Sequence, residues 1–133
     1  MRIGLSTFTI LSCVAASPAS AETWRRSSDG QGIVAYIDVD SIKRKGERVT
    51  FWRELRFPEV RSLNFNVRYD KMAALYEADC KARTLRSLKI RVRLGEEVVF
   101  RSDSKDSPQA ALPGSTAETD LRSACHDDWP KAG

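Results

Sequence analysis

Hydrophobic and polar positions alternate most regularly between Thr84 and Leu94. The apolar residues share one parity and the polar residues share the other: Leu88, Ile90, Val92 and Leu94 against Ser87, Lys89, Arg91 and Arg93. Such alternation is typical of a β-strand with one buried face and one solvated face. The pattern therefore predicts an antiparallel sheet whose outer face carries Lys89, Arg91 and Arg93.

The stretch before it is predicted to form a neighbouring strand. Residues at every second position share one face of this strand: Met72, Ala74, Tyr76, Ala78 and Cys80. The two alanines would leave space for a closely packed element, and a C-terminal helix is the natural candidate. Ser115 can cap that helix, and Glu118 completes a capping box three residues later. The apolar face of the helix would then carry Ala117, Leu121, Ala124 and Cys125.

Four shorter strands complete the expected sheet: Thr23–Ser27, Ile33–Val39, Arg48–Phe57 and Glu97–Arg101. Turns are predicted at Ser28–Gly30 and Lys43–Gly46, and a loop at Ser102–Pro113. Pro58 is expected to end the strand before it, because proline lacks the amide donor of the ladder. Residues Glu59–Lys71 are compatible with a short extra strand or with a loop. The fold class is therefore α+β and mostly β, with an antiparallel sheet of about six strands and a C-terminal helix.

The third of these strands carries large side chains on both faces. Its apolar parity contains Phe51 and is interrupted by Arg53, whereas Trp52 takes the opposite parity. Either Phe51 or Trp52 must therefore face away from the main core, unless the helix covers that side. The tryptophans of the chain are interpreted as packing residues rather than as a ligand platform.

The first 21 residues have the features of a signal peptide. A short positive segment precedes an apolar run, and Ala19-Ser20-Ala21 is a small-x-small cleavage pattern. We interpret residues 1–21 as a signal peptide and residues 22–133 as a single domain. The apolar run is too short to span a bilayer. Residues 10–13 also resemble a bacterial lipobox, in which case a lipid on Cys13 would be the contact with a membrane.

Export leaves Cys80 and Cys125 as the cysteines of the predicted mature domain. In an oxidising compartment they are expected to form a disulfide, which would link the C-terminal helix to the sheet. A metal site is the alternative. It lacks partners, because His126 is the single histidine and no Cys-x-x-Cys spacing occurs.

Charge adds a candidate recognition surface. The chain has a formal net charge of +4 and contains 22 basic and 18 acidic residues. Lys89, Arg91 and Arg93 would lie about 7 Å apart on one face, since same-face neighbours are separated by two strand rises. Such a row can meet an acidic protein segment, a polyanion or anionic lipid heads. The alternative is a solvated sheet face that prevents aggregation.

Sequence motifs for catalysis are absent. No nucleophile lies at a recognisable spacing from His126, which is interpreted as a surface or helix-terminal residue. Asp38 and Asp40 are two residues apart, but Ile42 breaks the pattern of a calcium loop. Glycine-rich phosphate loops and zinc signatures do not occur either. The protein is therefore expected not to be an enzyme, and to need no cofactor, metal or nucleic acid.

Several short motifs occur in an order that resembles a known family. They are Tyr36-Ile37-Asp38, Ser41-Ile42, Gly46, Trp52, Asp79-Cys80, Arg83, Pro113-Gly114-Ser115, Leu121 and Cys125. Together they resemble the surface-adhesin protein E-like domain of Gram-negative bacteria. The resemblance implies a six-stranded antiparallel sheet with a C-terminal helix, placed in the cell envelope. The namesake of the family is an outer-membrane lipoprotein that adheres to host extracellular-matrix and plasma proteins.

Two functions follow from the resemblance and the basic row. The first is an exported envelope binding module that contacts extracellular-matrix or envelope proteins, or polyanions, through the basic sheet face. The alternative is a periplasmic structural or assembly factor with no host-binding role. The expected location is the periplasm or the outer-membrane surface of a Gram-negative bacterium. The residues do not indicate an oligomeric state.

Overall fold

The computed structural model describes residues 22–103 and 105–131. The predicted signal peptide at residues 1–21 and the lipobox residue Cys13 lie outside the described residues. The strands are β1 (Trp24–Gly30), β2 (Ile33–Asp38), β3 (Lys43–Lys45), β4 (Arg48–Ser62), β5 (Arg68–Asp79), β6 (Thr84–Leu94), β7 (Glu97–Ser102) and β8 (Gln109–Ala110). A 3-10 helix, η1 (Val39–Ser41), follows β2, and one α-helix, α1 (Thr116–His126), lies near the C-terminus.

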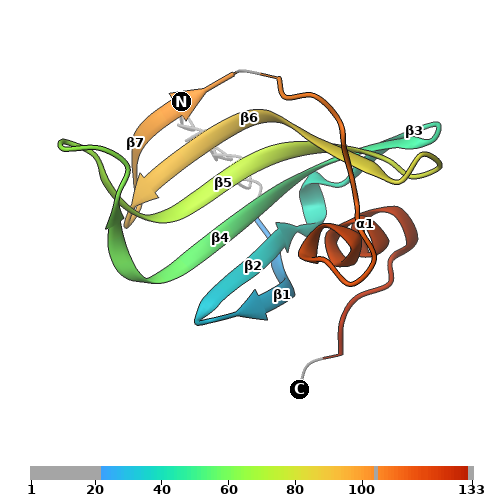
Figure 1. The fold of residues 1–133 in the computed structure, drawn as a ribbon, viewed down its shortest axis with the longest axis horizontal. Coiled ribbons are helices and arrows are strands. Elements are labelled where there is room, and N and C mark those ends of the chain that lie inside the picture. Colours follow the sequence, from blue (N-terminus) through green and yellow to red (C-terminus); the bar gives the residue numbers. More distant parts are fainter. Residues whose placement is uncertain (1–21, 104, 132–133) are drawn as a thin grey trace, which may run out of the picture.

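The strands form one antiparallel sheet in the order β1-β2-β4-β5-β6-β7, with β3 paired to β4 and β8 paired to β6 (Figure 1). This confirms the predicted fold class, including the C-terminal helix. The bounds of β6 agree with the alternating pattern that predicted them. None of the helices in the described part of the chain is long and apolar enough to cross a membrane.

Two predicted strand ends are wrong. β1 continues to Gly30, and the turn lies at Gln31 and Gly32, whose φ angles of 55° and 79° suit a two-residue hairpin. β4 does not end at Pro58 but runs to Ser62. Its pairing with β5 is interrupted by a register shift between Arg56 and Arg61. Proline is tolerated there because a bulge does not need every ladder donor.

A second irregularity changes the face of one predicted residue. The register of β6 against β5 shifts beside Leu88, so that Tyr76 pairs with Ser87 and Leu75 pairs with Lys89. A bulge of this kind inserts one extra residue and inverts the alternation on one side of it. Ser87, predicted to face outward, is therefore buried, and its hydroxyl donates to Asp106 (2.5 Å).

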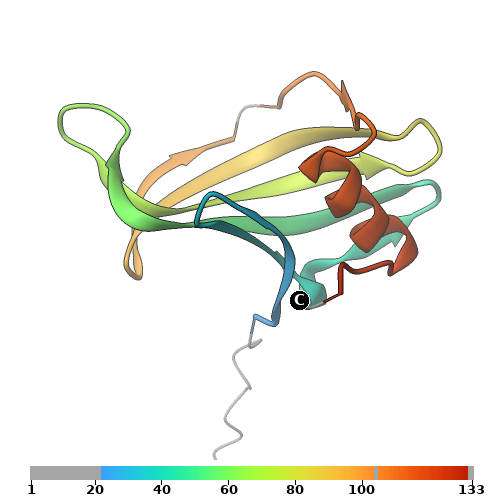
Figure 2. The ribbon, with the colours of Figure 1, turned by 60° about the horizontal axis from the view of Figure 1, so that its bottom comes forward.

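The core lies between α1 and one face of the sheet. Figure 2 shows α1 at one end of that face, opposite the end that carries the β4–β5 hairpin. The buried residues of the core come from both layers: Ile37, Val49, Phe51, Ala78, Cys80, Leu85, Ala111, Leu121, Ala124 and Cys125. A disulfide joins Cys80 and Cys125, whose Cα atoms are 5.8 Å apart. The predicted link between helix and sheet is confirmed.

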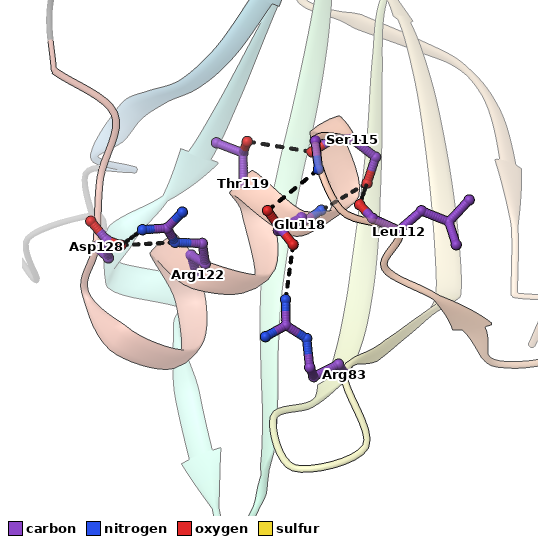
Figure 3. A network of polar contacts seen from close by, with 8 residues as sticks. Arg83, Leu112, Ser115, Glu118, Thr119, Arg122 and Asp128 are labelled. Carbon is purple, nitrogen blue, oxygen red and sulfur yellow. Dashed lines mark hydrogen bonds and ion pairs between the residues drawn. The ribbon is translucent and has the colours of Figure 1, made fainter.

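The N-terminus of α1 is capped as its sequence predicts, with one difference. The Ser115 hydroxyl accepts from the Glu118 amide (3.2 Å), but the Glu118 carboxylate accepts from the Gly114 amide (3.4 Å) rather than from Ser115. The other oxygen of that carboxylate binds Arg83 of the β5–β6 turn at 2.9 Å (Figure 3). Glu118 thus contributes to the cap and also ties the helix to the sheet.

A buried ion pair joins the middle of α1 to the sheet. Arg53, which interrupts the apolar parity of β4, lies with its Nε 2.6 Å from Asp120 Oδ2. Burial raises the pKa of Asp120 above its ordinary value, while the charge of Arg53 and the nearby Ser27 hydroxyl lower it only in part. The folded state therefore binds this proton more tightly than the unfolded chain does.

This raised pKa sets the sign of a pH effect. Stability that depends on the protonated Asp120 is fully present below its ordinary pKa of 3.8 and is lost as the pH rises through the raised folded value. We expect the unfolding free energy of the parent to fall relative to that of Asp120→Asn as the pH rises across that window, because the variant has no group that titrates there. Urea unfolding at a series of pH values measures it. A parent that gained stability relative to Asp120→Asn with rising pH would indicate that Arg53 depresses the pKa instead.

Candidate functional site

The sheet face turned away from α1 carries the basic residues predicted from sequence, and we call it the open face. Paired residues of antiparallel strands project to the same face. Three rows of such pairs cross the open face: Trp52–Leu75–Lys89, Tyr36–Glu54–Ala73–Arg91 and Arg56–Lys71–Arg93. The register thus places Lys89, Arg91 and Arg93 on one face and brings Arg56 and Lys71 beside them.

The position of Trp52 on the open face is set by the turn after β2. Asp38 caps η1 by accepting from the Asp40 amide (3.1 Å). The Ser41 hydroxyl donates to the Asp38 carbonyl (2.7 Å) and accepts from the Trp52 amide (2.8 Å). Asp38, Ser41 and Trp52 belong to the motifs that carry the family resemblance. They act together as one turn that fixes the backbone of β4.

Asp38 and Asp40 also bind the segment before β1. The Thr23 amide donates to Asp38 (3.1 Å), and the Thr23 hydroxyl donates to Asp40 (2.7 Å). Their carboxylates thus order the start of the described chain. Across residues 22–103 and 105–131, no cluster of three or more acidic, histidine or cysteine side chains is arranged to hold a metal ion.

Two arginines of the open face stack on aromatic rings. The Arg91 guanidinium lies 4.5 Å from the ring centroid of Trp52, and that of Arg56 lies 4.1 Å from the ring centroid of Tyr36. Stacking holds a guanidinium in place by cation–π attraction while its edge stays able to donate to a carboxylate or phosphate. Trp52 is half-buried and faces away from the core, which Phe51 enters. It is therefore a platform for Arg91.

The charges of Arg56 and Arg93 are balanced differently. Arg56 donates to Glu54 (2.8 Å), a carboxylate that is only 2% exposed. Arg93 lies directly opposite Lys71 on β5, and like charges in that position destabilise a sheet. Lys71 is 3.3 Å from the exposed Glu96, but Arg93 Nε is buried and has no hydrogen-bond partner within the described part of the chain. The part of the open face around Lys71 and Arg93 therefore has an excess of positive charge.

The three predicted residues therefore differ in environment. Lys89 is exposed, whereas Arg91 and Arg93 are half-buried. The sequence pattern gives no signal for Lys71, because it ends the segment 59–71 that is compatible with a strand or with a loop. Only the strand register, which the alternating pattern does not contain, places Lys71 beside Arg93.

A cavity of about 320 Å³ lies on the other face, between α1, the sheet and the segment before β8. Its walls include Phe51, Tyr76, Asp106 and Asp120. The two carboxylates are engaged with Ser87 and Arg53, respectively. His126 is exposed at the end of α1 and does not line this cavity. The described lining of the cavity includes serines but no histidine that could act as their base.

Comparisons with known proteins agree with this architecture. The family model for surface-adhesin protein E matches residues 24–126. Two solved structures of Haemophilus influenzae protein E are similar in fold. One, in crystal form II, is 12% identical with a TM-score of 0.57 and covers 81% of this chain and 98% of its own. The other is 13% identical with a TM-score of 0.56 and covers 80% and 92%. No curated protein matched the sequence.

Proposed function

This chain belongs to the surface-adhesin protein E family, and we propose from this that it is an exported cell-envelope binding module with a basic recognition face. The family and the fold support an adhesin-like surface protein, and the family is one of adhesins rather than of enzymes. Recognition through Lys89, Arg91 and Arg93 is the part of the proposal that rests on the open face.

The excess positive charge around Arg93 carries this proposal. Two cations opposite each other on neighbouring strands reduce stability unless negative charge offsets them. The exposed Glu96 offsets Lys71 alone. An acidic partner would supply the missing charge to Arg93, and Arg91 is already held on Trp52 for bidentate hydrogen bonding.

The chemistry of this face fits carboxylate, sulfate or phosphate groups. Suitable partners are acidic segments of extracellular-matrix or envelope proteins, or a polyanion. A periplasmic structural or assembly factor is the second candidate, because the same face could bind an acidic envelope component. Antibody access on intact cells supports the surface module, whereas release only by osmotic shock supports the periplasmic factor.

Neutralising the row tests the recognition face. We expect the triple variant Lys89→Gln, Arg91→Gln, Arg93→Gln to bind immobilised heparin and matrix proteins about a hundredfold more weakly at low salt. This follows from about 1 kcal/mol for each basic residue near an anionic surface. Affinity chromatography with a salt gradient and surface plasmon resonance measure the change.

A matched variant controls for net charge. Lys81→Gln, Lys105→Gln, Lys131→Gln removes the same charge from exposed positions outside the three rows of the open face. Its binding should stay close to that of the parent. Equal weakening in both triple variants would mean that net charge, rather than the open face, determines retention. Unchanged retention of the first variant would reject the face.

A further inference from the structure

The β4–β5 hairpin forms the end of the molecule opposite α1. In both ribbon views its turn lies at the far end of the sheet from the helix (Figures 1 and 2). β4 ends at Ser62 and β5 begins at Arg68, so residues 63–67 form the tip. This tip belongs neither to the core nor to the three rows of the open face.

The tip exposes apolar side chains to solvent. Phe65 is 106% exposed, as much as an isolated residue, and Leu63 is 42% exposed; Val60, on β4 just before the tip, is 46% exposed. Clustered exposure of this kind marks an interaction site on soluble proteins, whereas single exposed apolar residues need no explanation.

The turn that presents Phe65 is closed by hydrogen bonds. The Leu63 amide donates to the Val67 carbonyl (2.8 Å). The Asn64 side chain accepts from the amides of Asn66 (2.9 Å) and Val67 (3.0 Å). The backbone that carries the phenyl ring is thus ordered, so little backbone conformational entropy remains to be lost when the ring binds.

The charges on the two rungs next to the turn are positive. Residues 60–69 contain Arg61 and Arg68, and the nearest acidic residues in the sequence, Glu59 and Asp70, lie one position outside this stretch, farther from the turn. The register pairs Ser62 with Arg68 and Arg61 with Tyr69, which puts both arginines on the rungs next to the turn. Both are exposed, and the Arg61 guanidinium lies 4.4 Å from the ring centroid of Phe57. An apolar tip with a basic collar complements an apolar layer beneath negative head groups.

We propose that the tip of the β4–β5 hairpin docks into the surface of an anionic lipid bilayer. Phe65 and Leu63 enter the boundary between head groups and acyl chains, and Arg61 and Arg68 contact the phosphates. A second copy of the chain is a poorer partner for the tip, because contact between two tips would bring four arginines together. The proposal is independent of the recognition face, which lies elsewhere on the molecule.

Flotation with lipid vesicles tests the proposal. We expect the parent to bind vesicles of mixed phosphatidylglycerol and phosphatidylcholine, and Phe65→Ser to bind them about tenfold more weakly because an apolar contact is lost. Phe100→Ser is the matched control, since Phe100 is 43% exposed on β7 and should not affect binding. Arg61→Gln, Arg68→Gln should reduce binding to anionic vesicles selectively.

Insertion has a separate readout. Vesicles with brominated acyl chains should quench the emission added by Phe65→Trp, but not that added by Phe100→Trp. The Lys89→Gln, Arg91→Gln, Arg93→Gln variant should still bind vesicles, so failure of one proposal leaves the other standing. Thermal unfolding of each variant verifies that it is folded.

Four results would overturn the lipid proposal. They are absence of vesicle binding by the parent, equal binding by Phe65→Ser, equal weakening by Phe65→Ser and Phe100→Ser, and quenching at both positions. If Phe65→Ser instead abolished self-association, or binding to a matrix protein, with vesicle binding unchanged, the tip would contact a second copy or a protein. Either result also excludes the bilayer.

Discussion

Removing the disulfide by Cys80→Ala, Cys125→Ala is expected to lower the free energy of unfolding by about 4 kcal/mol on the chain-entropy estimate. The bond closes a sequence separation of 45 residues, so its loss returns a large amount of conformational freedom to the unfolded chain. Both cysteines are buried, and the alanines would also leave small gaps between α1 and the sheet. A loss of this size is a large share of the stability of a small domain.

Urea unfolding of the parent, the double variant and the reduced parent measures this effect. The reduced parent should be destabilised to a similar extent, which separates loss of the bond from loss of the side chains. Hydrogen exchange should rise first in α1, because the helix otherwise depends on contacts from one side. A decrease below about 1 kcal/mol would show that those contacts alone hold the helix.

Breaking the Arg53–Asp120 pair has the second large effect. Asp120→Ala leaves the Arg53 guanidinium, with its side chain 13% exposed, without its partner at 2.6 Å. An uncompensated buried charge of this kind costs about 3–5 kcal/mol. The double variant Arg53→Met, Asp120→Leu should recover most of that loss, because apolar residues of similar volume remove both charges.

An exposed pair in the same layer provides the control. Arg83 and Glu118 are 2.9 Å apart, but the Arg83 side chain is 55% exposed. Arg83→Ala should therefore cost less than about 1 kcal/mol. Denaturant unfolding of the parent and these variants compares the buried pair with the exposed pair. If Asp120→Ala cost no more than Arg83→Ala, the buried pair would contribute little to the attachment of α1.

Sequence patterns predicted the parts of the fold that depend on local chemistry. The alternation in β6 defined that strand, and Ser115 marked the start of α1 because a capping side chain acts within one turn. The disulfide followed from two cysteines and the expectation of an oxidising compartment. The alanines of β5 indicated where the helix lies, and Ala78 is fully buried.

Features that depend on register could not be predicted in this way. The bulge beside Leu88 turns Ser87 inward, but nothing in the local pattern marks an extra residue. The end of β4 was misplaced because the bulge that accommodates Pro58 requires knowledge of its partner strand. For the candidate site, alternation placed Lys89, Arg91 and Arg93 on one parity, whereas the contribution of Lys71 and the stacking of Arg91 on Trp52 depend on neighbouring strands.

The location of α1 on one side of the sheet also affects how such a protein can change during evolution. Substitutions beneath the helix disturb the core, the disulfide and the Arg53–Asp120 pair together. The side chains of the three rows on the opposite side belong to none of these, although Glu54 is itself buried there. Substitutions can therefore accumulate on one surface while the scaffold is inherited unchanged, which is compatible with a shared fold at 12% sequence identity.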